Sequence, residues 1–466
     1  MVNKISIQQI ISPVDGSVYA ERELADQTTI ERMLARSQEA QQSWQSTPIA
    51  KRIEIVEKMV QHLEADVTEI ATELSWQMGR PVRFTPNEIA RGFQERARYM
   101  SSIVDQSLGE IAVPQNQGFT KFMRREPVGT VLVIAPWNYP YLTAVNSVVP
   151  ALLAGNTVII KHASQTMLCA ERFANAFRQA GLPDGVFQYI HASHSSVAQM
   201  IADTRINFVV FTGSVGGGQA IEHAAAGRFI GVATELGGKD PSYVRPDCDL
   251  AYTIGENVDG SFFNSGQSCC AIERIYVHSD VYDQFVDGFV AATKSYVLGN
   301  PLDSNTTIGP MINVGAANFV RQQIAEAKSQ GAQALVDEEN FSGSQSGTPY
   351  LGPTVLVGVD HSMSVMRDES FGPVVGIMRV NSDDEAIRLM NDSQYGLTAS
   401  VWTSDQDVAV RIGSQIKTGT VYMNRCDYVD PQLVWTGVKN TGRGIALSHL
   451  GFDHFTQLKS YHLKNL

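Results

Sequence analysis

Two adjacent cysteines, Cys269 and Cys270, end the stretch FFNSGQSCC in a chain that has five cysteines among 466 residues. A cysteine in its thiolate form is a nucleophile, and enzymes use it to form covalent intermediates. A free cysteine also packs as a small apolar side chain and is among the most buried residue types. For either cysteine taken alone, a structural role explains its presence as well as a catalytic role does.

A glycine-rich turn is the second chemical feature. In INFVVFTGSVGGGQAIEHAAA (206–226) an apolar run leads through Gly213 and Ser214 into a helical stretch. Glycines let backbone N–H groups approach a phosphate, and the N-terminus of a helix favours negative charge. The spacing departs from G-x-G-x-x-G, so the pattern alone is compatible with a dinucleotide site or with a tight turn that binds nothing.

Glu235 follows the apolar run GVAT and precedes LGGKDP, where a domain boundary would form a cleft. A carboxyl group at a strand end in an apolar cleft tends to have a raised pKa and can act as a base. Its position also suits a ribose-binding carboxylate, which a simple dinucleotide fold places ~20 residues beyond the turn. A buried glutamate in a structural hydrogen-bond network is the third interpretation.

The elements that would position these residues follow a regular pattern. Residues 27–107 have apolar side chains at helical spacing, and from residue 129 short apolar runs alternate with helical stretches. The first series of runs is TVLVIA, NTVIIK, FQYIH, INFVVF and FIGVATEL, and the second is RIYVH, TVLVGV, GPVVGIMRV, ASVWT and GTVYMN. This alternation predicts an α/β fold with two mostly parallel sheets covered by helices.

We expect the chain to divide near residue 238. The predicted dinucleotide-binding domain is discontinuous, with residues 1–110 and 128–237, and the predicted catalytic domain comprises residues 238–440. The segments TKFMRREPV and TQLKSYHL alternate in polarity like half-exposed strands. We therefore predict that residues 111–127 and 450–466 form a small antiparallel β element that joins subunits.

Composition excludes several classes of function. The net charge is −12 and no Lys/Arg-rich run is present, which argues against a nucleic-acid or anionic-membrane partner. An odd number of cysteines without a CxxC pair indicates a reducing compartment rather than a disulfide framework or a zinc site. The start MVNKISIQQI lacks the apolar segment of a signal peptide, so we expect a cytoplasmic protein.

Two further patterns, an uncharged stretch and a pair of histidines, are interpreted as ordinary structural features. No charged residue occurs between Glu126 and Lys161, but prolines and glycines interrupt this stretch, so it predicts strand, loop, helix and strand rather than a membrane span. His191 and His194 have HxxH spacing without an acidic or cysteine neighbour. We interpret them as a polar loop and assign no metal.

Six motifs in register decide between the alternatives. They are APWNYP (135–140), GNTVIIKHAS (155–164), FTGSVGGG (211–218), ELGGKDP (235–241), FFNSGQSC (262–269) and ESFGPV (369–374). Together they resemble the aldehyde dehydrogenase superfamily, from about residue 10 to the C-terminus. The resemblance implies a Rossmann-like cofactor domain, a catalytic domain, and NAD(P)-dependent oxidation of an aldehyde to a carboxylic acid.

The resemblance also assigns catalytic roles. The family nucleophile is the cysteine of G-Q-x-C, which here is Cys269. Since neighbouring side chains of an extended segment point to opposite faces, Cys270 is expected to face away into packing. By resemblance, the amide of Asn138 and the backbone N–H of Cys269 stabilise the oxyanion, and Glu235 activates the water that hydrolyses the thioester.

The resemblance implies seven cofactor contacts: Trp137, Lys161, Ser164, Gly213, Ser214, Glu369 and Phe371. Lys161 would reach the adenine-ribose hydroxyls, Glu369 would hold the nicotinamide ribose, and Phe371 would lie against the ring. Many NAD-preferring members have glutamate where this chain has Ser164, and a carboxylate there would repel a 2′-phosphate. A hydroxyl can hydrogen-bond to that phosphate, so we predict that NADP is accepted as well as NAD.

The substrate is less constrained. Succinate-semialdehyde members often carry an arginine where this chain has Asn146, although Arg425 could supply the charge instead. The acids and aromatics of RCDYVDPQLVWTGVKN (425–440) suit a cationic aminoaldehyde, and they equally suit a solvated rim. We expect Tyr139, Arg425 and Trp435 to line the substrate pocket.

Three rival functions are disfavoured. CoA-acylating relatives generally lack the base glutamate, which is present here as Glu235, and a non-catalytic relative would have lost Cys269, Asn138 or Glu235. A zinc alcohol dehydrogenase would need ligands that the chain does not offer. The resemblance further implies that the protein forms a homodimer or homotetramer. Its expected small-molecule partner is an aldehyde.

Overall fold

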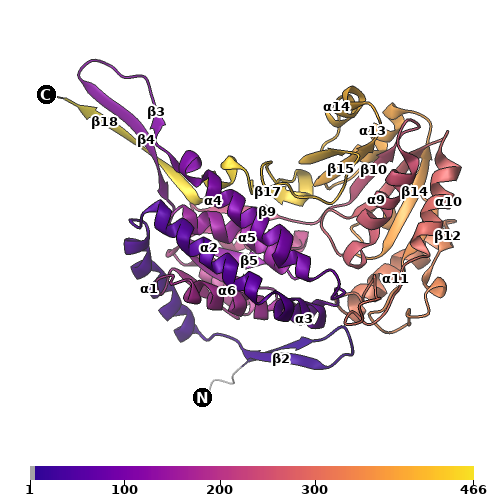
Figure 1. The fold of residues 1–466 in the computed structure, drawn as a ribbon, viewed down its shortest axis with the longest axis horizontal. Coiled ribbons are helices and arrows are strands. Elements are labelled where there is room, and N and C mark those ends of the chain that lie inside the picture. The colour runs from indigo at the N-terminus through magenta and orange to yellow at the C-terminus, as the bar shows by residue number, and fades with distance from the viewer. Residues whose placement is uncertain (1–5, 466) are drawn as a thin grey trace.

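The computed structural model describes residues 6–465. It has two sheets, each covered by helices, and an extended β arm (Figure 1); each sheet together with its helices is called a layer below. A six-stranded sheet and a seven-stranded sheet form the two layers, a three-stranded sheet forms the arm, and a two-stranded sheet lies near the N-terminus. The predicted fold class, two mostly parallel sheets plus a small antiparallel element, is confirmed. Residues 1–5 of the first expected segment and residue 466 of the last lie outside the described residues.

The first sheet contains all five strands predicted from the first series of apolar runs. Its order is β17-β9-β8-β5-β6-β7, parallel except for β17, which pairs antiparallel with β9. The strands are β5 (Thr130–Ala135), β6 (Thr157–His162), β7 (Phe187–Tyr189), β8 (Ile206–Thr212), β9 (Gly231–Glu235) and β17 (Gly442–Arg443). β17 was not expected, because two residues give no periodic signal.

Alternate residues of this sheet pack against the helices on its two faces. In β5, Val131 and Val133 pack with the helices of one face, whereas Leu132 and Ile134 pack with those of the other. Such strands have no polar face, which explains their continuous apolar runs. The surrounding helices are α1 (Gln27–Trp44), α2 (Ile49–Ala65), α3 (Val67–Met78), η1 (Glu88–Phe93), α4 (Gln94–Leu108), α5 (Pro140–Leu153), η2 (Ser164–Thr166), α6 (Leu168–Gln179), α7 (His194–Ala202) and α8 (Val215–Ala225).

The second sheet has the order β12-β13-β14-β11-β10-β15-β16, with only the β12–β13 pair antiparallel. Its strands are β10 (Asp240–Val244), β11 (Ile272–His278), β12 (Gln333–Val336), β13 (Thr354–Val357), β14 (Val374–Val380), β15 (Thr398–Trp402) and β16 (Thr420–Met423). β10 was not expected, because its sequence DPSYV follows a glycine-rich motif and contains a proline. Phe262, Phe285 and Phe289 pack against one face of this sheet.

The helices of the second layer confirm the stretch predicted after RIYVH. They are α9 (Leu250–Phe262), η3 (Phe263–Gly266), α10 (Tyr282–Thr293), α11 (Val314–Ser329), η4 (Glu338–Asn340), α12 (Ser364–Arg367), α13 (Asp383–Asn391) and α14 (Gln406–Gly413). Two short 3₁₀ segments follow β16, η5 (Lys439–Thr441) and η6 (His449–Phe455). They return the chain from the second sheet to β17 and then to the arm.

The arm joins segments that are far apart in the sequence. β18 (Thr456–Lys464) pairs antiparallel with β4 (Phe119–Pro127) along its whole length, and β3 (Ile111–Ala112) pairs with the other edge of β4. The strands predicted there are therefore present, and Figure 1 shows them projecting away from both layers. A separate hairpin of β1 (Ile7–Ile11) and β2 (Val18–Glu23) lies near the N-terminus.

The uncharged stretch between Glu126 and Lys161 folds as predicted, into strand β5, helix α5 and strand β6. Within residues 6–465, no helix combines the length and apolarity that crossing a membrane requires. The carboxyl ends of β5, β6, β8 and β9 all lie at one edge of the first sheet. In open parallel sheets this edge is where ligands bind, so it is the expected place for the site.

Candidate functional site

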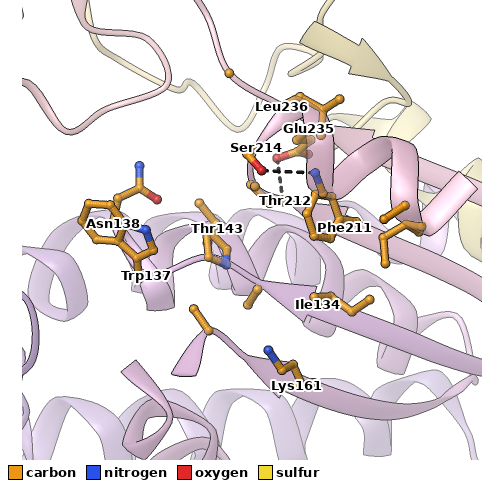
Figure 2. A pocket seen from close by; sticks show the side chains of 18 of the residues that line it. Ile134, Trp137, Asn138, Thr143, Lys161, Phe211, Thr212, Ser214, Glu235 and Leu236 are labelled. Carbon is orange, nitrogen blue, oxygen red and sulfur yellow. Dashed lines mark hydrogen bonds between the residues drawn. The ribbon is translucent and has the colours of Figure 1, made fainter. Parts of the chain in front are cut away.

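A cavity of about 600 Å³ opens at that edge, which is within the size range of cofactor sites. It also touches the turn before β11 and the loop before β14, so both layers contribute to its wall. Figure 2 shows Trp137, Asn138, Lys161 and Glu235 around this space. The structure brings together all ten residues expected for catalysis and cofactor binding: Trp137, Asn138, Lys161, Ser164, Gly213, Ser214, Glu235, Cys269, Glu369 and Phe371.

The two cysteines lie in different environments, although not for the expected reason. They lie in a turn before β11 rather than in an extended segment, so the argument from alternating side chains was wrong. Cys269 lines the cavity, whereas Cys270 is buried and donates its thiol to Asp427 Oδ1 at 3.1 Å. The adjacent Cys269 thiol, burial and the Asp427 charge hold the pKa of Cys270 well above its usual range. Cys270 therefore stays a thiol at neutral pH.

Gly238 brings the loop after β9 against the turn that contains Cys269. A side chain at Gly238 would meet the backbone oxygen of Cys269 at 2.3 Å, so only glycine permits this approach. A Cβ atom at Gly237 would meet the Glu369 carboxylate at 2.2 Å, so a side chain there would have to displace that carboxylate. Gly238 of the ELGGKDP motif thus allows the segment after Glu235 to lie against the backbone of Cys269.

Asn138 follows β5 and is 4% exposed. Its Nδ2 donates to the backbone oxygen of Gln267 at 3.2 Å, two residues before Cys269. Asn138 lines the cavity, and because a side-chain amide has two N–H donors, one is left after the hydrogen bond to Gln267. The arrangement places a fixed, neutral donor beside the cysteine, which is what an oxyanion site requires.

Glu235 is the last residue of β9, and its position at a strand end matches the expectation. Burial raises the pKa of Glu235 to about 7, while the charge of Arg96 and a hydrogen bond from Thr212 act in the opposite direction. Thr212 Oγ1 donates to Glu235 Oε2 at 3.5 Å, as Figure 2 shows. A carboxyl group with this pKa can accept a proton near neutral pH.

The glycine-rich turn forms the start of α8. Ser214 caps this helix by accepting a hydrogen bond from the N–H of Gly217 at 3.2 Å. A Cβ atom at Gly213 or Gly217 would meet the Phe211 ring at 2.6 Å, so a larger residue at either position would have to displace that ring. The first turn of α8 therefore presents N–H groups to the cavity, an arrangement that suits a phosphate.

The part of the cavity that would hold the adenosine half of a dinucleotide lies near β6. Lys161 is 8% exposed, and burial lowers its pKa. Ser164 lies three residues further on, at the start of η2. Beyond them the wall is made by α7 and α8: His194, Val197, Ala198, Ala220, Ile221 and Ala224. Sequence reasoning missed these residues, except that His194 was assigned to a polar loop, because their helical spacing signals only packing.

The loop before β14 carries Glu369 and Phe371. Glu369 Oε1 accepts from the N–H of Gly238 at 3.1 Å, and burial together with the nearby Glu273 charge raises the pKa of Glu369 to about 7. Phe371 meets the Trp137 ring edge to face at a centroid distance of 5.6 Å. Glu273, which sequence reasoning missed, accepts from the N–H of Phe371 at 2.9 Å and so fixes the loop.

The three residues expected to line the substrate pocket are not brought to this cavity. Trp435 is 6% exposed and packs in the core of the first layer. Arg425 is exposed and stacks on Tyr428 at 3.6 Å from the ring centroid. Tyr139 lies under the guanidinium of Arg80 at 4.4 Å.

The two histidines of the HxxH pattern lie in different surroundings. His191 Nε2 lies 2.9 Å from Glu171 Oε1, whereas His194 begins α7 and faces the cavity. In the part of the chain that the structure describes, no group of three or more His, Cys, Asp or Glu side chains is placed to hold a metal ion.

Known proteins resemble this chain over nearly its whole length. The sequence model described as "Aldehyde dehydrogenase family" matches residues 3–461. The chain is 34% identical to an aldehyde dehydrogenase of Paenarthrobacter nicotinovorans, with 97% of this chain and 98% of that protein covered. It is 32% identical to the succinate semialdehyde dehydrogenase (NAD(P)+) of Escherichia coli strain K12, with 97% and 96% covered.

Solved structures show the same similarity. The succinic semialdehyde dehydrogenase from Streptococcus pyogenes, in complex with NADP+, superposes with a TM-score of 0.93 at 27% identity, and 98% of this chain and 100% of that chain are covered. The betaine aldehyde dehydrogenase from Staphylococcus aureus, in complex with NAD+, has a TM-score of 0.93 at 27% identity, with 99% and 92% covered.

Proposed function

The chain belongs to the aldehyde dehydrogenase family and is an NAD(P)-dependent enzyme; on this premise we propose that it works through a covalent intermediate on Cys269. The observation that carries the proposal is the meeting of Cys269, Asn138 and Glu235 at one cavity, from three segments far apart in the sequence. Purified protein with either cofactor and a panel of aliphatic, aromatic, amino- and carboxy-aldehydes tests it. Absence of turnover across this panel would contradict it.

The proposed reaction starts at the sulfur of Cys269. Its thiolate attacks the aldehyde carbon, a C–S bond forms, and the carbonyl electron pair moves to the oxygen. The free N–H of Asn138 and the backbone N–H of Cys269 hold that oxygen while it is negative. When the tetrahedral adduct collapses, hydride leaves the carbon and a thioester remains on Cys269.

The residues around the cavity fit a nicotinamide dinucleotide, which accepts the hydride when bound. The start of α8 would hold the pyrophosphate, Lys161 the adenine ribose and Glu369 the nicotinamide ribose. Glu235 then takes a proton from water, and the water oxygen attacks the thioester carbon. The C–S bond breaks, which releases the carboxylic acid and restores the thiolate of Cys269.

We propose that NADP is accepted, because Ser164 lines the cavity three residues after Lys161 and leaves no carboxylate there to repel a 2′-phosphate. Replacing Ser164 with glutamate should lower kcat/KM for NADP by about 100-fold, the loss expected when a charged hydrogen bond becomes a repulsion. The value for NAD should change little. Steady-state rates with both cofactors measure this ratio, and an unchanged ratio would remove Ser164 from cofactor selection.

We propose a carboxylate-bearing semialdehyde as the substrate, and Arg96 of α4 supports it. Its guanidinium Nη1 donates to the oxygen of Leu142 at 2.6 Å and to Asn146 Oδ1 at 3.3 Å. A cation from α4 thus reaches the position on α5 where related semialdehyde enzymes carry their arginine. Arg96 is 8% exposed, its Nε is unpartnered among residues 6–465, and burial lowers its pKa. The charges of Glu235, Glu95 and Glu88 act on Arg96, but it forms no ion pair among residues 6–465. A buried guanidinium without a directly paired carboxylate is costly unless it binds one.

Replacing Arg96 with methionine tests this substrate class. We expect kcat/KM for succinate semialdehyde to fall by about 100-fold more than that for butanal, because only the former has a carboxylate to pair. Any loss shared by both aldehydes would follow from a higher pKa of Glu235, which the Arg96 charge lowers. Arg98→Met is the matched control, since Arg98 lies on the same helix but pairs with Glu57 and Glu64 at the surface. Equal losses for both aldehydes would contradict the assignment.

The assembly and the location of the protein are also proposals. We propose that β18, the outer strand of the arm, pairs with another subunit in a homodimer or homotetramer, since its edge is unpaired in the described chain and Leu458 and Leu463 are exposed on it. A cytoplasmic location is supported by the cysteine content alone.

A further inference from the structure

A buried ion pair lies behind the Asn138 amide, and we propose that it positions this amide for catalysis. The pair is formed by Arg80, which follows α3, and Glu88, the first residue of η1. Arg80 Nη1 lies 2.5 Å from Glu88 Oε2, and the two side chains are 2% and 0% exposed. Neither residue lines the cavity. The proposal rests on the oxyanion role of Asn138 in the proposed function, which it extends to two positioning residues.

The guanidinium of Arg80 connects both sides of the oxyanion site. Its Nη2 donates to the backbone oxygen of Asn138, and its Nε donates to Asn264 Oδ1 at 3.2 Å. Its face covers the Tyr139 ring at 4.4 Å from the centroid. Because a guanidinium is planar and its N–H groups have fixed directions, it sets the distance between these acceptors in a way that a lysine cannot.

Asn264 passes this constraint to the cysteine turn. Its Nδ2 donates to the backbone oxygen of Gln267 at 3.2 Å and to that of Asn138 at 3.4 Å. The same oxygen of Gln267 accepts the Nδ2 of Asn138 at 3.2 Å. The hydrogen bonds therefore close a ring that fixes the backbone and the side chain of Asn138 relative to a residue two positions before Cys269.

Glu88 fixes the other end of the arrangement. Its Oε1 accepts from the N–H groups of Tyr141 at 2.8 Å and Leu142 at 3.3 Å, in the first turn of α5. The N-terminal residue before α5 makes no side-chain cap, so Glu88 provides a cap from outside the helix. A carboxylate is also favoured there by the helix dipole. Glu88 thus locks the segment that follows Asn138 against Arg80.

The function of this pair is geometric rather than stabilising. Buried ion pairs contribute little net stability relative to apolar residues of the same size, so their presence needs another reason. Here the reason is that an oxyanion donor works only when it is held in place before the reaction. Displacement of a reacting group by ~1 Å can cost about 100-fold in rate.

A double-mutant cycle on kcat/KM tests the proposal with Arg80→Gln and Asn138→Ala. We expect Asn138→Ala to lower kcat/KM by ~10²–10³-fold and Arg80→Gln by about 100-fold. In the Asn138→Ala background, Arg80→Gln should cost less than about threefold, because its effect acts through the missing amide. Affinity for NADP, measured by quenching of protein fluorescence, should be unchanged by Arg80→Gln.

Arg52→Gln is the matched control, since Arg52 is also buried, lies 5.8 Å from a tryptophan ring and donates to backbone oxygens, but does not touch the cavity. It should lower the melting temperature and leave kcat/KM unchanged. If Arg80→Gln does not fold, Arg80→Lys and Glu88→Gln enter the same cycle with losses of about tenfold or more.

The possible outcomes separate the two proposals. If the effects of Arg80→Gln and Asn138→Ala multiply in the double variant, or Arg80→Gln weakens cofactor binding as much as turnover, the positioning role is wrong. If Asn138→Ala alone leaves kcat/KM unchanged, the oxyanion assignment in the proposed function fails instead. Full activity in both Arg80→Lys and Glu88→Gln would also overturn the positioning role.

Discussion

Alanine in place of Cys269 is expected to abolish aldehyde oxidation, with kcat falling by about 10⁴-fold or more, as for other enzymes that lose their nucleophile. Cys269 is the cysteine that lines the cavity, and in the proposed reaction no other group forms a bond to the carbonyl carbon. Cofactor binding should survive, because the sulfur is not among the proposed contacts to the dinucleotide. Steady-state rates and cofactor fluorescence measure the two effects separately.

Cys270→Ala is the matched control for this prediction. The two cysteines are adjacent in sequence, but Cys270 is buried against Asp427 and its raised pKa keeps it protonated. We therefore expect most of the activity to remain in Cys270→Ala. If Cys270→Ala were the inactive variant and Cys269→Ala were active, the assignment of the nucleophile would be wrong.

Glu235→Gln is expected to stop the reaction after the first turnover. Glutamine has the shape of glutamate but cannot take a proton from water, so the thioester should form and then persist. Steady turnover should fall by about 10²–10⁴-fold, which is the range for removal of a general base. Rapid mixing should still show a burst of one reduced cofactor per active site. Unchanged steady turnover would remove Glu235 from the mechanism.

The pH dependence of thioester hydrolysis follows from the same residue. Burial raises the pKa of Glu235 from its ordinary value to about 7, so the carboxyl group is protonated below that pH, where an ordinary glutamate would be ionised. Because only the ionised form is a base, the hydrolysis rate should be maximal above pH 7 and fall about tenfold for each pH unit below it. A rate that stays level down to pH 5 would contradict this.

The strand-end residues could be predicted from the sequence because their signals are local. Lys161, Glu235 and Gly213 each follow or end an apolar run, and parallel strands bring their carboxyl ends to one edge. The apolar runs also predicted the two sheets, since strands covered on both faces have continuous apolar sequences. The resemblance then assigned roles to residues that the topology had only placed near one another.

Residues that act through distant partners could not be predicted. Arg80 and Asn264 are 184 positions apart, and neither lies in a periodic pattern that would link them. Arg96 has the helical spacing of an ordinary buried residue, so its proximity to Asn146 emerges only from the packing of α4 on α5. The burial of Trp435 could not be predicted, because an aromatic residue in a loop gives no sign of whether it faces solvent or core.

The most direct test is the mass of the Glu235→Gln enzyme after its burst with cofactor and aldehyde. We predict a gain equal to one acyl group, located on Cys269 by peptide mapping, absent from the Cys269→Ala, Glu235→Gln double variant and retained when Cys270 is replaced instead. An acyl group found on Cys270, or reduced cofactor formed without any gain in mass at position 269, would contradict the account.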